Sequence, residues 1–234
     1  MFDVHCHMLP GMDDGSKDVA TSIEMIRRSA EQGVEGIVFT PHFYAHLNSP
    51  EEFLDRRSRS LAELEAELDK LSVVPKYTVG AEVHYFKGIS RINDLNRLCI
   101  GKSDYILIEM PFCVWKPNII DEVEEISQVS GLSVIIAHVD RYLDQDKRLL
   151  SRLIENPDIL IQCNADFFIE RRTQSKALKI LKNGVIDLIA SDSHNLNSRK
   201  PNIAEAVGII EKRDNRIFLD HIIETGQKIF EAAL

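Results

Sequence analysis

The chain has 234 residues, a formal net charge of −9 and a hydrophobic share of 44%. This length suits one α/β barrel with a large core, and the hydrophobic share is ordinary for a globular protein. The acidic balance argues against a general nucleic-acid binder, which would carry a basic surface. It leaves anionic substrates open, because bound metal ions can dominate the field at a site.

Short apolar runs alternate with amphipathic stretches along the whole chain. The predicted strands are Phe2–His5, Gly36–Thr40, Tyr77–Ala81, Tyr105–Glu109, Ser133–Ala137, Ile159–Gln162 and Val185–Ala190. The predicted helices are Ser16–Gln32, Pro50–Leu71, Asn118–Ser130, Gln145–Glu155, Gln174–Lys182, Asn202–Lys212 and a last one from Arg216. Strand-then-helix repetition is typical of a parallel sheet, and seven units favour a closed or nearly closed barrel. We therefore expect one domain over residues 1–234.

The cysteines and the N-terminus bear on where the protein works. Cys6, Cys99, Cys113 and Cys163 form no C-x-x-C pair and lie in apolar surroundings, so we expect reduced, buried and inert thiols. No basic region followed by a long apolar stretch opens the chain, and no apolar run approaches ~18 residues. We expect a cytoplasmic protein without a signal peptide, transmembrane helix or other membrane insertion.

Ionisable residues follow nearly every predicted strand. His5 and His7 are two residues apart, so in a strand both imidazoles point to one face. The carboxyl ends of the strands of a (β/α) barrel converge on one rim, where catalytic groups sit. Imidazole and carboxylate groups at that rim predict a multinuclear metal site. Its predicted ligands are His5, His7, Asp14, His42, Glu82, Glu109, His138, Asp192 and His194.

Four other ionisable residues near these positions are expected to play no direct part. Asp13 precedes the candidate ligand Asp14, and His46 and His84 lie near the rim without a partner of their own. His221 falls in a polar helix, which favours a surface position.

Two arginines lie on loops that leave the same rim. Arg141 follows His138 by three residues, and Arg199 follows His194 by five. A planar guanidinium with five donors matches the oxygens of a phosphate group. We therefore predict that both arginines bind a phosphoryl group.

Other phosphate and hydrolase chemistries lack their motifs. No cysteine is followed six positions later by arginine, so the phosphate cradle of cysteine-dependent tyrosine phosphatases is absent. Gly101-Lys102-Ser103 is similar to the end of a P-loop, but Asn96 stands where the first glycine is needed, which favours a plain turn. Neither H-E-x-x-H nor G-x-S-x-G occurs.

Together these motifs resemble the PHP (polymerase and histidinol phosphatase) superfamily, and more closely the bacterial manganese-dependent protein-tyrosine phosphatases encoded with capsule and exopolysaccharide genes. The most specific match is the opening segment from Asp3 to Gly15, D-V-H-C-H-M-L-P-G-M-D-D-G. The other matches are Thr40-Pro41-His42, Gly80-Ala81-Glu82, Ala137 to Tyr142 and Ser191 to Asn195. The resemblance covers essentially the whole chain in matching order.

The resemblance implies a distorted (β/α)7 barrel with three metal ions, generally manganese, with iron, zinc and magnesium as alternatives. It also implies dephosphorylation of a membrane-associated bacterial tyrosine kinase that controls capsule or exopolysaccharide synthesis. The chain departs from the family pattern at Phe43, at Val139-Asp140 and at Asn164–Phe168. These departures concern substrate preference, because the expected ligands are intact.

The expected chemistry is attack of a metal-bridging hydroxide on a phosphomonoester, with the arginines offsetting charge in the transition state. Asp14 or His194 could also donate the proton to the leaving group. A phosphotyrosine ring is expected to pack on Phe43, Tyr44, Phe112 or Trp115. Two alternatives stay open: a small-molecule phosphatase, such as one acting on histidinol phosphate, and a metal-binding barrel without turnover.

Overall fold

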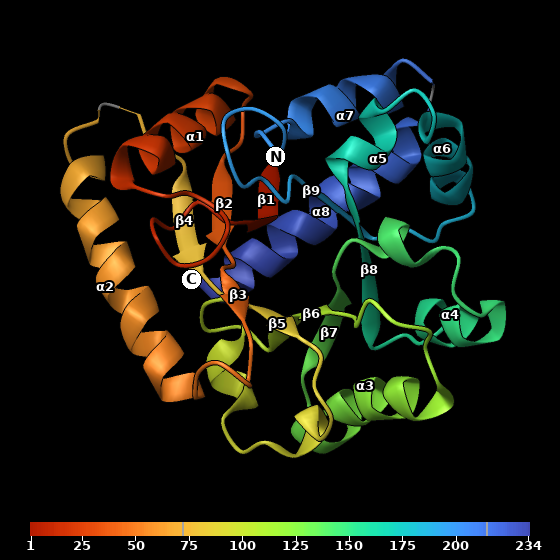
Figure 1. Ribbon diagram of the computed structural model, residues 1–234. Coiled ribbons are helices and arrows are strands. Elements are labelled where there is room, and N and C mark those ends of the chain that lie inside the picture. The colour runs from red at the N-terminus through yellow and green to blue at the C-terminus, as the bar shows by residue number, and fades with distance from the viewer. Residues whose placement is uncertain (72, 214) are drawn as a thin grey trace.

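The protein is described by a computed structural model that covers residues 1–71, 73–213 and 215–234. Its strands run parallel in two sheets (Figure 1). The first sheet has the order β1 (Phe2–Cys6), β2 (Gly36–Phe39) and β4 (Lys76–Val79). The second has the order β3 (His42–Phe43), β5 (Glu82–His84), β6 (Tyr105–Glu109), β7 (Ser133–Ile136), β8 (Ile159–Asn164) and β9 (Leu188–Ala190).

The two sheets are joined at three places. β2 leads into β3 across Thr40 and Pro41, and β4 leads into β5 across Gly80 and Ala81. On the far side a parallel bridge pairs Cys6, at the end of β1, with Ser193 beyond β9. The seven predicted strands are therefore all present, and their order is that of a barrel distorted by two interruptions. The α/β fold with parallel strands is confirmed, although the pairing is divided between two sheets.

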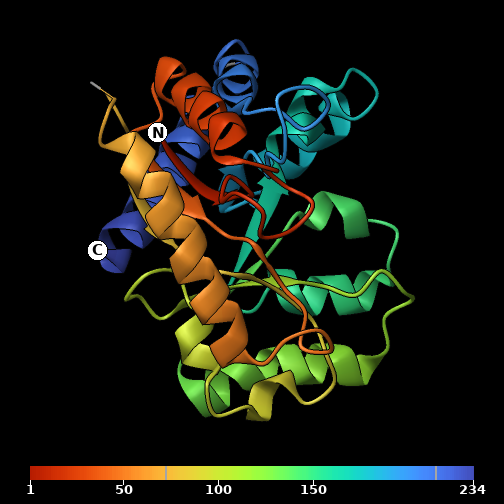
Figure 2. The same ribbon diagram turned by 60° about the vertical axis from the view of Figure 1, so that its left-hand side comes forward.

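The helices surround these strands (Figures 1 and 2). They are α1 (Val19–Glu31), α2 (Pro50–Leu68), α3 (Pro117–Ser130), α4 (Lys147–Ile154), α5 (Ala165–Ile169), α6 (Gln174–Lys182), α7 (Ile203–Glu211) and α8 (Arg216–Ala233). The short 3-10 helices are η1 (Ile89–Arg91), η2 (Leu95–Leu98) and η3 (Val139–Tyr142).

Local sequence explains where the helices on the β1–β4 side begin. The side chain of Asp18 accepts a hydrogen bond from the backbone N–H of Thr21 and caps α1. Ser49 and Glu52 form a reciprocal capping box at α2, with Pro50 in its first turn. These caps satisfy N–H groups that have no partner inside the helix.

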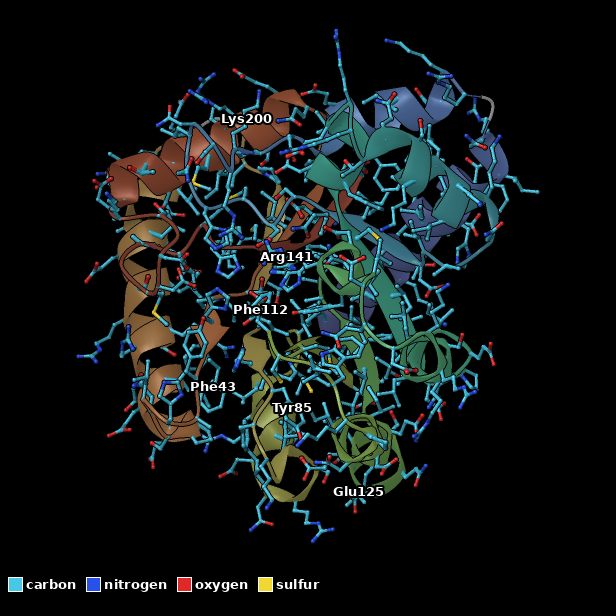
Figure 3. All side chains as sticks on the ribbon, turned by 45° about the vertical axis from the view of Figure 1, so that its right-hand side comes forward. Phe43, Tyr85, Phe112, Glu125, Arg141 and Lys200 are labelled. Atoms are coloured by element: carbon cyan, nitrogen blue, oxygen red, sulfur yellow. The ribbon has the colours of Figure 1, made fainter. Side chains whose placement is uncertain are left out.

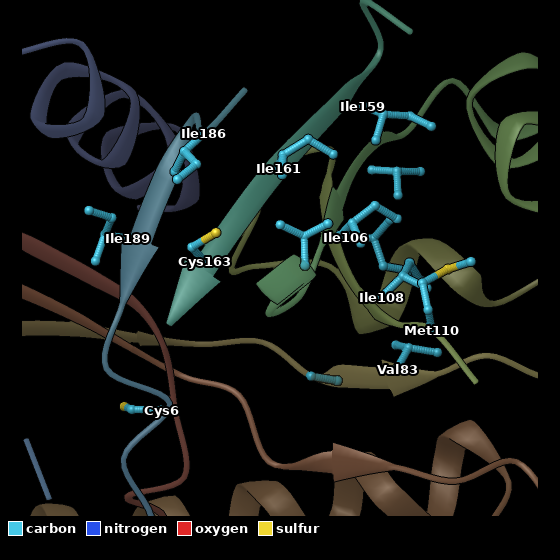
Figure 4. Packing of buried hydrophobic residues seen from close by; sticks show 14 of the residues in the cluster. Cys6, Val83, Ile106, Ile108, Met110, Ile159, Ile161, Cys163, Ile186 and Ile189 are labelled. Carbon is cyan, nitrogen blue, oxygen red and sulfur yellow. The ribbon is translucent and has the colours of Figure 1, made fainter. Parts of the chain in front are cut away.

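The apolar core has two parts. The larger part lies between the strands and the helices around them, and Figure 4 shows Ile106, Ile108, Ile161 and Ile189 within it. The smaller part is enclosed by the strands themselves, with α8 packed against β1, β2 and β9. Its members are Val4, Val38, Ile100, Leu107, Ile135, Ala137, Leu188, Ala190, Ile229, Phe230 and Ala233.

The enclosed part of the core explains where the polar residues gather. Successive side chains of a strand alternate between faces, so a residue two positions after an enclosed apolar one shares its face. Glu109 follows Leu107 in this way on β6, and Asp192 lies two residues after Ala190, just beyond the end of β9. β1 also directs side chains to this end of the strands, but the simple alternation is interrupted there, because the register of β1 with β2 shifts between Asp3 and Cys6. The carboxyl ends of the strands therefore carry the predicted site.

The expectation of four buried thiols is wrong for one of them. Cys6, Cys99 and Cys163 are buried, but Cys113 is exposed, because the loop between β6 and α3 runs over the surface. Within the described residues, no helix is both long enough and apolar enough to cross a bilayer.

Candidate metal centre

The structure brings the predicted ligands together as three clusters of donor atoms. Each cluster has all its donor atoms within 4.8 Å of one another. The clusters are His7, Asp14, His42 and His194; His5, His7, Glu82 and Asp192; and His42, Glu82 and Glu109. His7, His42 and Glu82 each belong to two clusters, so every pair of clusters shares one residue. Such an arrangement could hold up to three neighbouring cations.

His138 lies at the edge of this arrangement. Its Nε2 is 2.8 Å from Oε1 of Glu82 and 3.5 Å from Oε1 of Glu109. His84 approaches Glu109 from the other side, with Nδ1 2.8 Å from Oε2. His84 was expected to have no partner, and this contact corrects that expectation. It arises because Glu109 and His84 are paired residues of neighbouring strands β6 and β5.

The donor atoms of this site fit divalent cations. His42 Nδ1, Glu82 Oε2, Asp192 Oδ1 and His194 Nε2 are buried and have no hydrogen-bond partner. A buried polar atom without a partner is costly, so in a native protein such an atom calls for a ligand. Imidazole nitrogens and carboxylate oxygens without thiolates suit manganese, iron, zinc and magnesium.

The charges of the site are those that a cation needs. Burial alone would raise the pKa of Glu82, but His5, His42 and His138 outweigh it and hold that pKa well below the ordinary value. The pKa of Asp192 is lowered in the same way by His5 and His7, against the effect of burial. Burial and the neighbouring His7 lower the pKa of His194 to about 2, which leaves a neutral imidazole with a free lone pair.

The loop between β1 and α1 orients His7. Asp13 Oδ2 lies 2.7 Å from His7 Nδ1 and accepts a hydrogen bond from the backbone N–H of His42 at 2.8 Å. Asp13 is therefore a positioning residue rather than a member of the clusters. Gly15 is required beside it, because a Cβ there would overlap the carbonyl oxygen and Cβ of His7. This explains the glycine in the Asp13-Asp14-Gly15 motif.

Two amides of β8 connect the ligands, and sequence analysis missed both. Gln162 Oε1 lies 3.1 Å from His5 Nδ1 and accepts from the backbone N–H of His138 at 2.7 Å. Gln162 Nε2 donates to Asn164 Oδ1 at 3.0 Å, and Asn164 Nδ2 donates to Asp192 Oδ2 at 2.7 Å. The amides thus link His5 to Asp192. The sequence did offer one sign of them: the sixth predicted strand was the one predicted strand with no candidate metal ligand at its end.

Arg141 and Arg199, which were predicted to bind a phosphoryl group, both contact Asp192. Both guanidinium groups donate through Nη2 to Asp192 Oδ2, at 2.5 Å from Arg141 and 2.7 Å from Arg199. Arg199 Nη1 is also 3.7 Å from Asp14 Oδ2. Each arginine side chain is 32% exposed and keeps further N–H donors free for an anion.

Two site residues have strained backbones. His138 has φ 34° and Asp192 has φ 49°, and among the described residues these are the non-glycine positions with positive φ. Such conformations cost of order 1–3 kcal/mol and persist where the surroundings impose them, commonly at functional sites.

The expected aromatic contacts are partly wrong. Phe43 is 1% exposed and packs edge-on against Phe53, and Trp115 is 3% exposed and donates through Nε1 to the carbonyl oxygen of Pro111. Both belong to the core. Phe112, which is labelled in Figure 3, is 63% exposed. Its ring stacks over the ring of His138. Tyr44 lies against His42 and His84, with ring centroids 5.2 Å and 5.4 Å away.

Fold and site define an α/β protein with parallel strands whose carboxyl ends carry a candidate polynuclear metal centre. The family described as "Capsular polysaccharide synthesis, CpsB/CapC" matches residues 1–231. The chain therefore belongs to the CpsB/CapC family, and the resemblance seen in the sequence is confirmed.

Relatives agree with this assignment over nearly the whole chain. The tyrosine-protein phosphatase YwqE of Bacillus subtilis (strain 168) is 31% identical over 222 residues, covering 91% of this chain and 84% of that protein. The tyrosine-protein phosphatase CpsB of Streptococcus agalactiae is 26% identical over 239 residues, covering 94% and 96%.

A solved structure shares the fold. It comes from work described as "Crystal structures of YwqE from Bacillus subtilis and CpsB from Streptococcus pneumoniae, unique metal-dependent tyrosine phosphatases". It matches with a TM-score of 0.83 at 27% identity, covering 100% of this chain and 96% of the solved one.

Proposed function

We propose that this protein is a metal-dependent protein-tyrosine phosphatase that acts through a single catalytic unit spanning residues 1–234. The observation that carries the proposal is the set of three clusters linked by His7, His42 and Glu82, with two arginines converging on Asp192 beside them. The relatives named tyrosine-protein phosphatases support the choice of substrate class.

The nine predicted ligands would hold the metal ions, which we propose to be manganese, with His138 joining the clusters beside Glu82. Divalent ions held there would lower the pKa of a coordinated water and offset negative charge on the phosphoryl group. Arg141 and Arg199 bind phosphoryl oxygens through the N–H groups that Asp192 leaves free. Because these donors are held in place beforehand, they stabilise charge that develops in the transition state.

Asp14 is our candidate for the group that acts at the leaving group. Its side chain is 67% exposed, and its Oδ1 lies 3.4 Å from His194 Nε2 and 3.6 Å from His42 Nε2. A tyrosine leaving group has a pKa of about 10 and needs less protonation than an alkyl alcohol. Asp14 would supply what proton transfer is required; His194 suits that role less well, because its lowered pKa leaves the imidazole neutral.

The protein substrate is proposed to be a membrane-associated bacterial tyrosine kinase of capsule or exopolysaccharide synthesis, met in the cytoplasm. The family description, which concerns capsular polysaccharide synthesis, supports that setting. The three buried cysteines without disulfides agree with a reducing compartment.

Competition between substrates tests this function. We expect kcat/KM for a phosphotyrosine peptide to exceed that for a phosphoserine peptide and for histidinol phosphate by at least about tenfold, or ~1.4 kcal/mol of transition-state binding. A preference for histidinol phosphate would indicate a small-molecule phosphatase. No turnover of p-nitrophenyl phosphate by the manganese-loaded protein would indicate a binding module.

A further inference from the structure

An apolar recess lies beside the candidate metal centre, on the side of Asp14 and His42. It has a cavity volume of about 290 Å³. Met12, Tyr44, Leu47 and Phe53 form its apolar walls. Asp14 and His42 also line it, and both belong to the first cluster of the candidate metal centre. The recess and the metal centre are therefore continuous.

The recess is built from three segments that are fixed to one another. Arg56, on α2, donates through Nη1 to Asn48 Oδ1 at 2.7 Å and through Nη2 to the carbonyl oxygen of Met12 at 2.8 Å. It thereby ties the β1–α1 loop and the turn after β3 to the helix. Phe53 and Met12 are buried at the base, 1% and 7% exposed, whereas Leu47 is 65% exposed. A site held in shape before binding loses less entropy when a ligand enters.

Because the recess adjoins the candidate metal centre, its position restricts which ligands can occupy it. A ligand whose charged end is held at the metal centre can place only the atoms next to that charge in the recess. In a tyrosine phosphomonoester a single ester oxygen separates phosphorus from the aromatic ring. We propose that this recess, walled by Met12, Tyr44 and Leu47, binds the aromatic ring of the phosphotyrosine substrate. This deepens the proposed function and rests on it.

Phe112 is the competing surface, on the other side of the centre. Its ring stacks over His138 with centroids 6.3 Å apart and is 63% exposed. It offers one face to a ligand, whereas side chains of three segments line the recess, so a ring bound there would remove more apolar area from water. Burial of apolar area favours the recess.

Binding of two non-hydrolysable phosphonates to the manganese-loaded full chain tests the assignment. Phenylphosphonate carries an aromatic ring and methylphosphonate does not, so the ratio of their Kd values, measured by calorimetry, reports the ring alone. We expect the wild-type protein to prefer phenylphosphonate. Leu47→Ala should reduce that preference about three- to tenfold, because it removes apolar contact from an exposed position whose loss the fold tolerates.

Arg56→Ala should reduce the preference as well, since it releases the segments that form the walls. Val129→Ala is the matched control: Val129 is 60% exposed on α3, outside the residues that line the recess, and the preference should stay at the wild-type value. Thermal unfolding of each variant identifies any loss of fold.

Three results would overturn the assignment. One is a wild-type protein that binds both phosphonates equally or fails to bind phenylphosphonate. Another is an unchanged preference in Leu47→Ala. The third is a loss of preference in Phe112→Ala alone, which would move the ring to Phe112. Because the readout is binding, failure here leaves phosphatase turnover unaffected, and absence of turnover leaves the binding ratio measurable.

Discussion

At the scale of single residues, the two carboxylate oxygens of Asp192 contact different groups: one faces the candidate metal ligands and the other faces the two arginines. Its Oδ1 lies 3.4 Å from Nε2 of both His5 and His7, among the candidate metal ligands. Its Oδ2 accepts hydrogen bonds from Arg141, Arg199 and Asn164. One carboxylate therefore fixes the two arginines, our proposed anion-binding donors, relative to the candidate metal centre. Changes at the arginines should affect turnover without removing the ligands.

We predict that Arg141→Ala and Arg199→Ala each lower kcat by ~10²–10³, the usual cost of removing one preorganised donor. Lysine should restore little, because it cannot reproduce the planar fork of a guanidinium. Steady-state kinetics together with elemental analysis check this, since metal content should stay near that of the wild type. Arg97→Ala, at an exposed arginine on η2, is the control. Wild-type kinetics in both variants would remove the two arginines from the mechanism.

Gln162 should act on metal affinity instead. Neighbours that hold the second nitrogen of a ligating histidine typically contribute 10–100-fold in affinity. Gln162 Oε1, next to His5 Nδ1, favours the tautomer with the proton on Nδ1 and leaves Nε2 free for a cation. We expect Gln162→Leu to weaken manganese binding by ~10–100-fold, as measured by metal titration.

Gln162→Glu keeps an acceptor at the same place and should lose less affinity than Gln162→Leu. Gln227→Leu, on an exposed turn of α8, is the matched control and should bind manganese normally. Equal affinity in Gln162→Leu and the wild type would show that packing alone orients His5.

The residues of the site differ in how far the sequence predicts them. His5, Glu109 and Asp192 follow apolar runs, and parallel strands bring such positions to one rim whatever the details of packing. Gln162 has no such pattern, because an amide two positions beyond Leu160 looks like any strand residue. Phe43 and Trp115 were misplaced because adjacency to a rim residue does not say which way a side chain points. Those directions depend on tertiary packing.

At the scale of elements, periodicity predicts the long helices and most strands, but it misses the short strands β3 and β5. The predicted helix 174–182 agrees with α6 at both ends, and predicted strand 105–109 agrees with β6. β3 and β5 were missed because they have two and three residues, too few for an alternating pattern. Both follow an interruption, and tertiary pairing with β6 and with each other holds them as strands.

The turn at Gly101 provides a test of how the C-terminal helix is held. Gly101 has φ 53°, and a Cβ there would overlap the backbone carbonyl of Ala233 at the end of α8. The Lys102 N–H also donates to that carbonyl oxygen at 3.0 Å. We predict that Gly101→Ala destabilises the fold by at least about 1 kcal/mol more than the ~1–2 kcal/mol that positive φ alone costs an alanine.

Gly131→Ala is the matched control, because Gly131 has φ 68° and a Cβ there would meet nothing within 4 Å. Chemical denaturation of both variants separates backbone strain from steric overlap. Equal losses in the free energy of unfolding would show that α8 does not close against this turn.

At the scale of the whole molecule, the buried charges of the candidate metal centre reduce the free energy of unfolding. The carboxylates of Glu82 and Asp192 are at most 2% exposed, and buried charges without full compensation are expensive. The molecule also carries a net charge of −9, which adds repulsion among acidic groups. Cations bound at the centre would compensate both effects, so stability and activity should depend on the same ions.

Metal removal tests this dependence. A ligand that binds the folded state alone stabilises it by ~2.7 kcal/mol at a hundred times its Kd, and each kcal/mol is about 2–4 °C in Tm for a domain of this size. We therefore predict that excess chelator abolishes hydrolysis and lowers Tm by at least about 5 °C. Manganese should restore both, and restore hydrolysis at least as well as magnesium does.

Variants decide whether the predicted site is responsible for both effects. His5→Ala and Asp192→Ala should fold, lose hydrolysis and lose most of the rise in Tm on addition of manganese. His221→Ala is the control, because His221 is 58% exposed and lies outside the clusters. If the wild-type protein kept full activity in excess chelator, the chemistry would not need the ions. If His5→Ala kept the full rise in Tm, the ions would bind elsewhere, and the linked clusters would need another explanation for their unpartnered buried atoms.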